Sequence, residues 1–138
     1  MAKISDVMTP DPITLDVGEP IIAAARAMKE RDVGDVVVQE NGKVRGIVTD
    51  RDIVVRAVAE GRGPQEARLG EVCSSELAWI SPDADVADAV RLMREKSVRR
   101  LPVLSDDRPV GIVSLGDLAI EQDFESVLGE ISSAPGNT

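Results

Sequence analysis

The hydrophobic positions in the first half of the chain predict five elements in the order β-α-β-β-α. Residues 13–15 alternate as in a short strand, and residues 20–34 carry apolar side chains at the spacing of a helix that buries one face. Pro20 suits the first turn of that helix, and Gly34 is predicted to end it. A β-hairpin follows, and a second helix begins at Thr49.

The hairpin is predicted from two short runs of β-branched residues. They cover residues 36–38 and 44–48, and Asn41-Gly42 between them has the sequence of a type I′ turn. The helix after the hairpin has an apolar stripe that consists of Ile53, Val54, Ala57 and Val58.

The second half of the chain repeats this pattern at a constant offset of 65 residues, the distance from Gly46 to Gly111. Each copy reads Gly, two β-branched apolar residues, a hydroxyl residue, two variable positions and an acid, which is Asp52 or Asp117. A constant offset without gaps marks a duplicated unit. The second copy therefore predicts a short strand at 78–80, a helix capped by Asp83, a hairpin at 101–104 and 110–113, and a helix that begins at Ser114.

The repeat divides the chain into two copies of similar length. The predicted parts are a first copy at 1–62, a linker at 63–67, a second copy at 68–122, a short helix at 123–131 capped by Asp123, and a disordered tail at 132–138. A copy of about fifty residues would be marginal alone. We therefore expect the copies to pack together around a shared core with pseudo-two-fold symmetry.

Composition and charge exclude several classes of function. The net charge of −9 disfavours a nucleic-acid surface and an anionic membrane. No apolar run is long enough to span a bilayer, and the N-terminus has no signal-peptide pattern. The chain has no histidine and one cysteine, Cys73, so it lacks the commonest general base and the commonest metal ligand. We predict a cytoplasmic protein that is not an enzyme, with no metal and no required cofactor.

Each copy resembles a CBS motif, and the pair resembles a Bateman module. The resemblance rests on the duplicated stretch described above, on Val7-Met8-Thr9-Pro10 and on Arg99-Arg100-Leu101-Pro102-Val103, and it covers roughly residues 4–121. The chain is most similar to small stand-alone two-repeat proteins of bacteria. The resemblance implies an α/β (α+β) fold of two tandem β-α-β-β-α repeats.

The hydroxyl residue and the acid of each copy suit two different roles. Thr49 and Ser114 stand where a strand passes into a helix, and the amide groups there suit an anion such as phosphate. Asp52 and Asp117 lie three residues later, where a carboxylate can accept hydrogen bonds from a ribose diol. The same spacing is also that of a capping box, which stabilises a helix by about 1 kcal/mol without any ligand.

The resemblance to nucleotide-binding CBS modules implies two clefts of unequal strength. Carried over by position, the favoured cleft consists of Met8, Ile13, Val33, Gly34, Arg99, Arg100, Ser114, Gly116 and Asp117. The weaker cleft consists of Thr49, Arg51, Asp52, Cys73, Ala78 and Val98. The basic pair of the favoured cleft is replaced by Gly34 and Asp35 in the other copy, where an acid would repel phosphate. An exposed basic pair that bridges surface acids is the alternative reading of Arg99 and Arg100.

Two functional hypotheses follow. The first is a regulatory module that senses an adenosine-containing ligand such as AMP, ADP, ATP or a relative of them. The alternative is a ligand-free dimerising interaction protein. Apolar surface on the helices around Ala23 and Val54 exceeds what one buried stripe needs, so we expect a homodimer that acts on an unknown protein partner.

Overall fold

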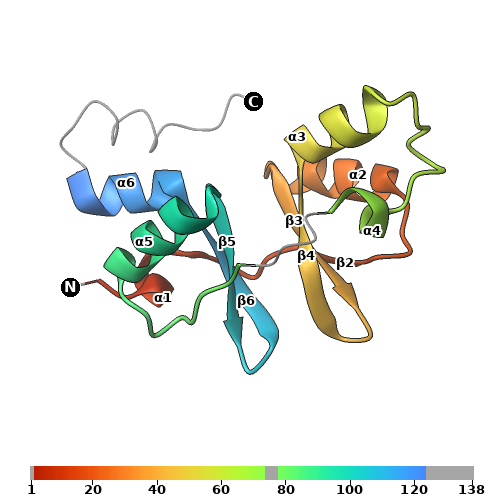
Figure 1. The fold of residues 1–138 in the computed structure, drawn as a ribbon. Coiled ribbons are helices and arrows are strands. Elements are labelled where there is room, and N and C mark those ends of the chain that lie inside the picture. Colours follow the sequence, from red (N-terminus) through yellow and green to blue (C-terminus); the bar gives the residue numbers. More distant parts are fainter. Residues whose placement is uncertain (1, 74–77, 124–138) are drawn as a thin grey trace. The chain divides into compact units, whose positions relative to one another are not determined.

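The structure is a computed structural model that describes residues 2–73 and 78–123. These residues form two compact units. The first-repeat unit contains residues 13–73. The second-repeat unit contains residues 78–123 together with residues 2–12 from the start of the chain. Both units carry helices against a three-stranded sheet, so the predicted α/β class is confirmed (Figure 1).

The first-repeat unit is built on a mixed sheet with the strand order β2-β3-β4, in which β2 is parallel to β3 and β3 is antiparallel to β4. Its core contains Val36, Val38 and Val48 from the sheet and Ala24 and Met28 from a helix. The elements are β2 (Thr14–Asp16), α2 (Ile21–Arg31), β3 (Asp35–Glu40), β4 (Lys43–Thr49), α3 (Asp50–Ile53), the π-helix η1 (Val54–Val58) and α4 (Leu69–Val72).

The second-repeat unit has a sheet with the strand order β1-β6-β5. Its elements are α1 (Ile4–Val7), β1 (Thr9–Pro10), α5 (Val86–Lys96), β5 (Arg100–Ser105), β6 (Arg108–Ser114) and α6 (Leu115–Asp123). The short strand expected at 78–80 is reduced to one parallel bridge, from Ile80 to Val103. The bridge is equivalent to the pairing of β2 with β3 in the first-repeat unit. The short segment of each repeat therefore joins the sheet of its own repeat.

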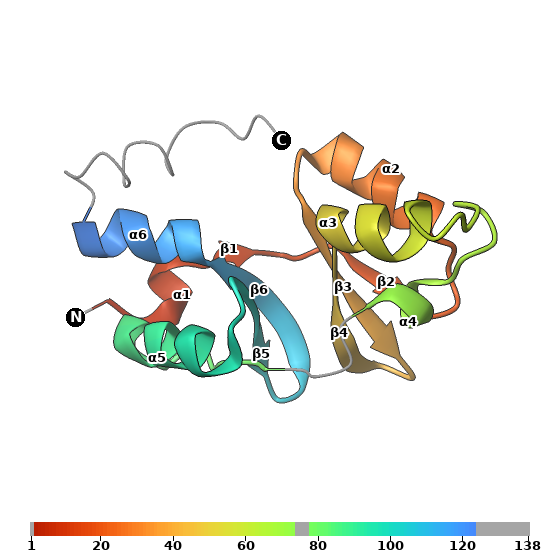
Figure 2. The same cartoon turned by 45° about the horizontal axis from the view of Figure 1, so that its top comes forward.

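The helix that precedes each repeat packs on the other repeat. The amide of Ile4 on α1 donates to the carbonyl of Ala84 at 2.9 Å, and the amide of Leu69 on α4 donates to the carbonyl of Glu19 at 2.9 Å. These two bonds are equivalent under the 65-residue offset. Helix α1, red in the ribbon views, therefore lies beside the blue helix α6 from the far end of the chain (Figures 1 and 2). Each repeat thus receives the helix that precedes the other repeat, and we call this the exchange of α1 and α4.

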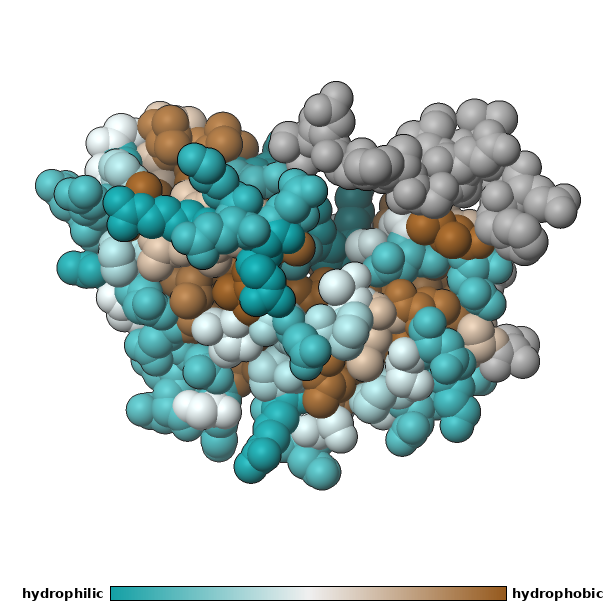
Figure 3. All heavy atoms as spheres, turned by 180° about the vertical axis from the view of Figure 1, so that it is seen from behind, coloured by the Kyte–Doolittle hydropathy of each residue, from teal (hydrophilic) through white to brown (hydrophobic). Residues whose placement is uncertain are grey.

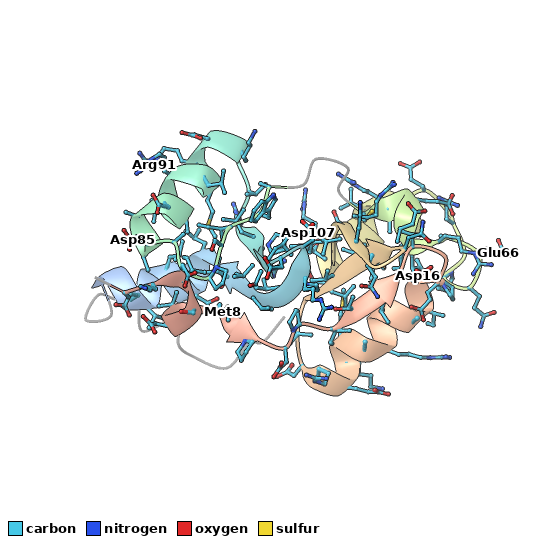
Figure 4. The ribbon with its side chains drawn as sticks, turned by 90° about the horizontal axis from the view of Figure 1, so that it is seen from below. Met8, Asp16, Glu66, Asp85, Arg91 and Asp107 are labelled. Atoms are coloured by element: carbon cyan, nitrogen blue, oxygen red, sulfur yellow. The ribbon has the colours of Figure 1, made fainter. Side chains whose placement is uncertain are left out.

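Both hairpins turn through residues with left-handed backbone conformation. Asn41 and Gly42 have φ values of 53° and 78°, as the predicted type I′ turn requires. Asp106 and Asp107 have φ values of 51° and 64° in the second hairpin, whose tip carries the Asp107 labelled in Figure 4. Asp tolerates this region better than most residues because its short side chain can hydrogen-bond locally.

Three predicted helix details are wrong. Helix α2 ends at Arg31 rather than Gly34, because Asp32 adopts the left-handed conformation (φ 53°) that closes a helix. Helix α5 begins after Asp85 rather than Asp83, and the Asp85 amide donates to the Asp88 carboxylate at 3.1 Å. The predicted stripe after Thr49 is split, because Ala57 is buried in η1 whereas the Val54 and Val58 on the same element are 56% and 59% exposed.

No helix among the described residues is long and apolar enough to cross a membrane. The predicted helix at 123–131 and the predicted tail at 132–138 lie almost wholly outside the described residues. Within them, Asp123 is the last residue of α6.

Candidate functional site

A strand-to-helix junction positions the candidate acid of the second-repeat unit. Ser114 ends β6 and Asp117 lies in the first turn of α6. The Ser114 amide donates to Asp117 Oδ2 at 2.9 Å, and the Asp117 amide donates to Ser114 Oγ at 3.1 Å. This reciprocal pair is a capping box. It engages one carboxylate oxygen and leaves Oδ1 of Asp117 as the atom that could accept a ligand hydroxyl.

The first-repeat unit has the same junction. Thr49 donates its amide to Asp52 Oδ2 at 2.9 Å, and the Asp52 amide donates to Thr49 Oγ1 at 3.1 Å. Arg51 lies on the exposed side of the short helix, at the position that Gly116 takes in α6. The sequence repeat is therefore a repeat of hydrogen-bond geometry as well.

Capping by an acid three residues later is common in this chain, so the two junctions need a further distinguishing property. The amides of Lys3, Asp16, Arg68 and Asp85 each donate to such an acid, and all four bonds are exposed. The bonds to Asp52 and Asp117 are partly buried. A partly buried carboxylate oxygen interacts more strongly with a hydrogen-bond donor than an exposed one. Asp52 and Asp117 are therefore the acids best suited to bind a ligand.

The basic pair lies beside the second junction. The Leu115 amide donates to the Arg99 carbonyl at 2.8 Å, and Arg100 is the antiparallel partner of Ser114. The first-repeat unit has the equivalent backbone hydrogen bond, in which the Asp50 amide donates to the Gly34 carbonyl at 3.0 Å. There Asp35 is the partner of Thr49. The two junctions thus differ in side-chain charge on a matched frame.

Met8 belongs to the same unit as the basic pair. It follows α1, and a Cβ placed on Gly111 would lie 2.5 Å from Met8 Sδ and 2.9 Å from the Thr9 carbonyl oxygen. Figure 4 shows Met8 within this unit, next to α1. Gly111 is therefore required by the close approach of Met8 and of β1, which pairs with β6.

Cys73 occupies the equivalent place in the first-repeat unit. It is buried in the core with Leu69 and Val72, and its Sγ lies 3.7 Å from the Gly70 carbonyl oxygen. Burial raises the pKa of the Cys73 thiol above its usual value. A thiol with a raised pKa is a poor nucleophile. Cys73 is therefore a small core residue rather than a reactive thiol.

Sequence reasoning missed Arg56. Its Nε lies 3.8 Å from Asp52 Oδ1, and its Nη1 donates to the carbonyls of Val72 at 3.3 Å and Cys73 at 3.5 Å. The spacing of Asp52 and Arg56, four residues apart on a helix, was a usable signal for the ion pair. The contact with the α4 carbonyls was not predictable, because it depends on the exchange of that helix.

The structure brings together part of each predicted residue set. In the second-repeat unit these residues are Met8, Arg99, Arg100, Ser114, Gly116 and Asp117; in the first-repeat unit they are Thr49, Arg51, Asp52 and Cys73. The remaining residues belong to the opposite unit in each case: Ile13, Val33 and Gly34 for the favoured cleft, and Ala78 and Val98 for the weaker one. Their part in either cleft stays a prediction.

The described residues contain no group of three or more His, Cys, Asp or Glu side chains that could hold a metal ion. The acids at the two junctions are instead engaged with backbone amides.

A family comparison matches both halves of the chain. The CBS domain model matches residues 4–58 and 69–122. The CBS domain-containing protein YhcV of Bacillus subtilis is 41% identical over 122 residues, which cover 88% of this chain and 86% of that protein.

Solved structures show the same fold. Hypoxic response protein 1 of Mycobacterium tuberculosis is 33% identical over 120 residues, covering 86% of this chain and 84% of that protein. The structure of Hypoxic Response Protein I with two coordinated zinc ions has a TM-score of 0.75 and covers 88% of this chain and 99% of its own. A CBS domain pair of protein MJ0100, solved with 5′-methylthioadenosine and S-adenosyl-L-methionine, has a TM-score of 0.75 at 25% identity and covers 86% of this chain and 97% of its own.

Proposed function

The chain belongs to the CBS-domain family as a tandem CBS pair, a regulatory module, and from this premise we propose that it senses an adenosine-containing ligand. One observation carries the proposal. Each repeat holds a partly buried acid at a strand-to-helix junction, with one oxygen engaged by a backbone amide, and in the second repeat the other oxygen of this acid takes part in no ion pair among the described residues. The 5′-methylthioadenosine and S-adenosyl-L-methionine bound by the similar CBS pair support an adenosine group as the shared feature.

The second-repeat junction is the proposed main site. Asp117 would accept the ribose hydroxyls, and Arg99 and Arg100 would contact the phosphates of AMP, ADP or ATP. Guanidinium groups pair well with phosphate because their planar donors match two oxygens at once. Met8 and the predicted contributions of Ile13, Val33 and Gly34 would provide apolar contact with the base.

The first-repeat junction is the proposed weaker site. Thr49, Arg51 and Asp52 repeat the frame, but Asp35 stands where Arg100 stands in the other copy. A carboxylate beside a phosphate raises the free energy of the bound state. The ligand-free interaction protein remains the competing function, and the widespread capping by acids favours it.

The described residues of this chain offer no ligand group for zinc ions such as those coordinated in the Hypoxic Response Protein I structure. The sequence has no histidine and one cysteine, and that cysteine is buried. Zinc sites in proteins draw mainly on these two residue types. The same shortage of bases and nucleophiles supports a regulatory role without catalysis, and the single cysteine supports a cytoplasmic location.

A homodimer is the proposed assembly. Val54, Val55 and Val58 on η1 are 56%, 44% and 59% exposed, a group of neighbouring large apolar side chains on one short element. The space-filling view shows brown hydrophobic patches among teal hydrophilic surface (Figure 3). Exposed apolar groups of this kind mark interaction surfaces.

Calorimetry of ligand-stripped protein against AMP, ADP, ATP, 5′-methylthioadenosine and S-adenosylmethionine tests the proposal. We expect binding of at least one compound that Asp117→Ala abolishes. Asp88→Ala is the matched control, because Asp88 caps a helix of the same unit through an exposed bond. If no compound binds at millimolar concentration, the sensor proposal fails and the interaction protein takes its place.

A further inference from the structure

We propose that Arg56 determines which repeat binds the ligand, by holding Asp52 in an internal ion pair. This inference rests on the proposed function, which it deepens. Asp52 has one oxygen, Oδ2, engaged by the Thr49 amide at 2.9 Å. Its other oxygen, Oδ1, faces Arg56 Nε at 3.8 Å. One oxygen of the first-repeat acid is therefore hydrogen-bonded within the protein, and the other is in an ion pair with Arg56.

Arg56 is held in place by more than its charge. Its Nη1 donates to the carbonyls of Val72 and Cys73, at 3.3 and 3.5 Å. These carbonyls lie at the C-terminal end of α4, where a helix leaves carbonyl groups without partners of its own. Arg56 thus joins the exchanged helix α4 to the acid of the first repeat. A ligand hydroxyl that approached Asp52 Oδ1 would have to displace an anchored guanidinium.

The burial of the pair favours this competition. The Asp52 side chain is 16% exposed and the Arg56 side chain is 52% exposed, so the carboxylate is the more shielded partner. A shielded carboxylate gains more from a neighbouring cation than a solvated one does. A neutral ribose diol offers weaker electrostatic compensation than the guanidinium.

The second repeat lacks this cation. The residue at the offset of 65 from Arg56 is Glu121, four positions after Asp117 on α6. Among the described residues, Asp117 has no ion-pair partner. A second acid at that spacing repels the carboxylate rather than neutralising it. Oδ1 of Asp117 therefore has no competing cation of this kind, whereas Oδ1 of Asp52 faces Arg56.

The test uses 5′-methylthioadenosine, because an uncharged ligand removes the effect of Asp35 on phosphate. Calorimetry of the full chain should give one equivalent bound by wild type and two by Arg56→Gln. Gln is neutral and polar, and it ends near the position of Nε, so it removes both the charge and the contacts of Nη1 with the α4 carbonyls. Arg26→Gln is the control for the change in net charge, since Arg26 is exposed on α2 of the same unit.

A second variant isolates the first repeat. Asp117→Ala should lose measurable binding of the ligand at millimolar concentration, and Asp117→Ala/Arg56→Gln should regain binding with a dissociation constant at least tenfold below that limit. Fluorescence of Trp79, the single tryptophan, and thermal melts confirm that each variant is folded. Two equivalents bound by wild type, or no regained binding in the folded double variant, overturns the role of Arg56 and leaves the sensor function standing. Failure of wild type and Arg56→Gln to bind any adenosine compound overturns both.

Discussion

Arg100 on β5 is the antiparallel partner of Ser114 on β6, and in the first repeat Asp35 is the partner of Thr49. The backbone register is the same, so the junctions differ in side-chain charge, and this position is one of those differences. A guanidinium beside a helix start attracts an anion, and a carboxylate repels it. This difference makes the ligand preference of the two repeats testable by single substitutions.

The first prediction concerns phosphate recognition by Arg100. Arg100→Gln should weaken binding of AMP, ADP or ATP about tenfold or more, because a charged hydrogen bond contributes about 1.5–3 kcal/mol. Binding of 5′-methylthioadenosine, which has no phosphate, should change little. Calorimetry with both kinds of ligand makes the measurement. Equal weakening for both kinds would assign Arg100 a structural role instead.

The second prediction separates the two acids. Asp117→Ala should abolish ribose recognition, whereas Asp52→Ala should leave tight binding nearly intact. Each substitution removes the same partly buried capping bond, which contributes about 1 kcal/mol to helix stability, and Asp52→Ala also removes the ion pair with Arg56. Thermal melts measure the loss of stability in each variant, and calorimetry measures the difference in ligand binding between them. The reverse pattern of binding would show that the first repeat is the main site.

Much of this frame was predictable because the repeat constrains it. The Asn41-Gly42 turn and the acid three residues after Thr49 follow from local chemistry that needs no knowledge of the rest of the chain. The exchange of α1 and α4 was not predictable. Ile4 and Leu69 are equivalent apolar positions, and a 65-residue offset is the same whether each helix packs on its own repeat or on the other.

The split of the predicted stripe after Thr49 has a similar cause. Helical spacing assumes an α-helix, but residues 54–58 form a π-helix whose bond runs from the Ala59 amide to the Val54 carbonyl at 2.8 Å. The wider turn changes which side chains share a face. Ala57 is buried while Val54 is exposed. The local sequence does not predict this π-helical turn, because the turn depends on packing with the rest of the unit.

The third prediction concerns the close approach at Gly111. Gly111→Ala would place a Cβ 2.5 Å from Met8 Sδ and 2.9 Å from the Thr9 carbonyl oxygen. We expect a loss of about 1–3 kcal/mol in the free energy of unfolding, the usual cost of overpacking. Urea denaturation measures it, with Gly63→Ala as the control at a site whose nearest atom is 3.4 Å away.

A double variant identifies the cause of that loss. Adding Met8→Ala to Gly111→Ala removes the side-chain clash but leaves the backbone oxygen of Thr9 in place. Gly111→Ala should therefore cost less stability in the Met8→Ala background than in wild type, but part of the loss should remain. Full additivity of the two substitutions would show that Met8 and Gly111 do not contact each other in solution.

The fourth prediction concerns assembly through η1. Val58→Glu should convert the expected homodimer into a monomer, because a charge at a buried interface position costs more than the lost apolar contact. Light scattering at micromolar concentration measures the change. Gln65→Glu adds the same charge at an exposed position of the same unit and should leave the dimer intact. A monomeric wild-type protein would refute the dimer.

The last prediction concerns pH and Cys73. Desolvation raises the pKa of this thiol in the folded protein above the reference value of 9.0. The folded state therefore binds the proton more tightly than the unfolded state. The resulting stabilisation is fully present below the unfolded pKa and is lost as the pH rises through the folded pKa.

Denaturation of wild type and Cys73→Ala across alkaline pH measures this effect. Wild type should lose stability more steeply than Cys73→Ala as the pH rises above about 9, where an unfolded thiol begins to ionise. The comparison uses slopes rather than absolute values, because truncation of a buried side chain also leaves a cavity. Parallel pH profiles would show that the Cys73 thiol ionises equally well in both states, contrary to its burial beside Leu69 and Val72 in the core.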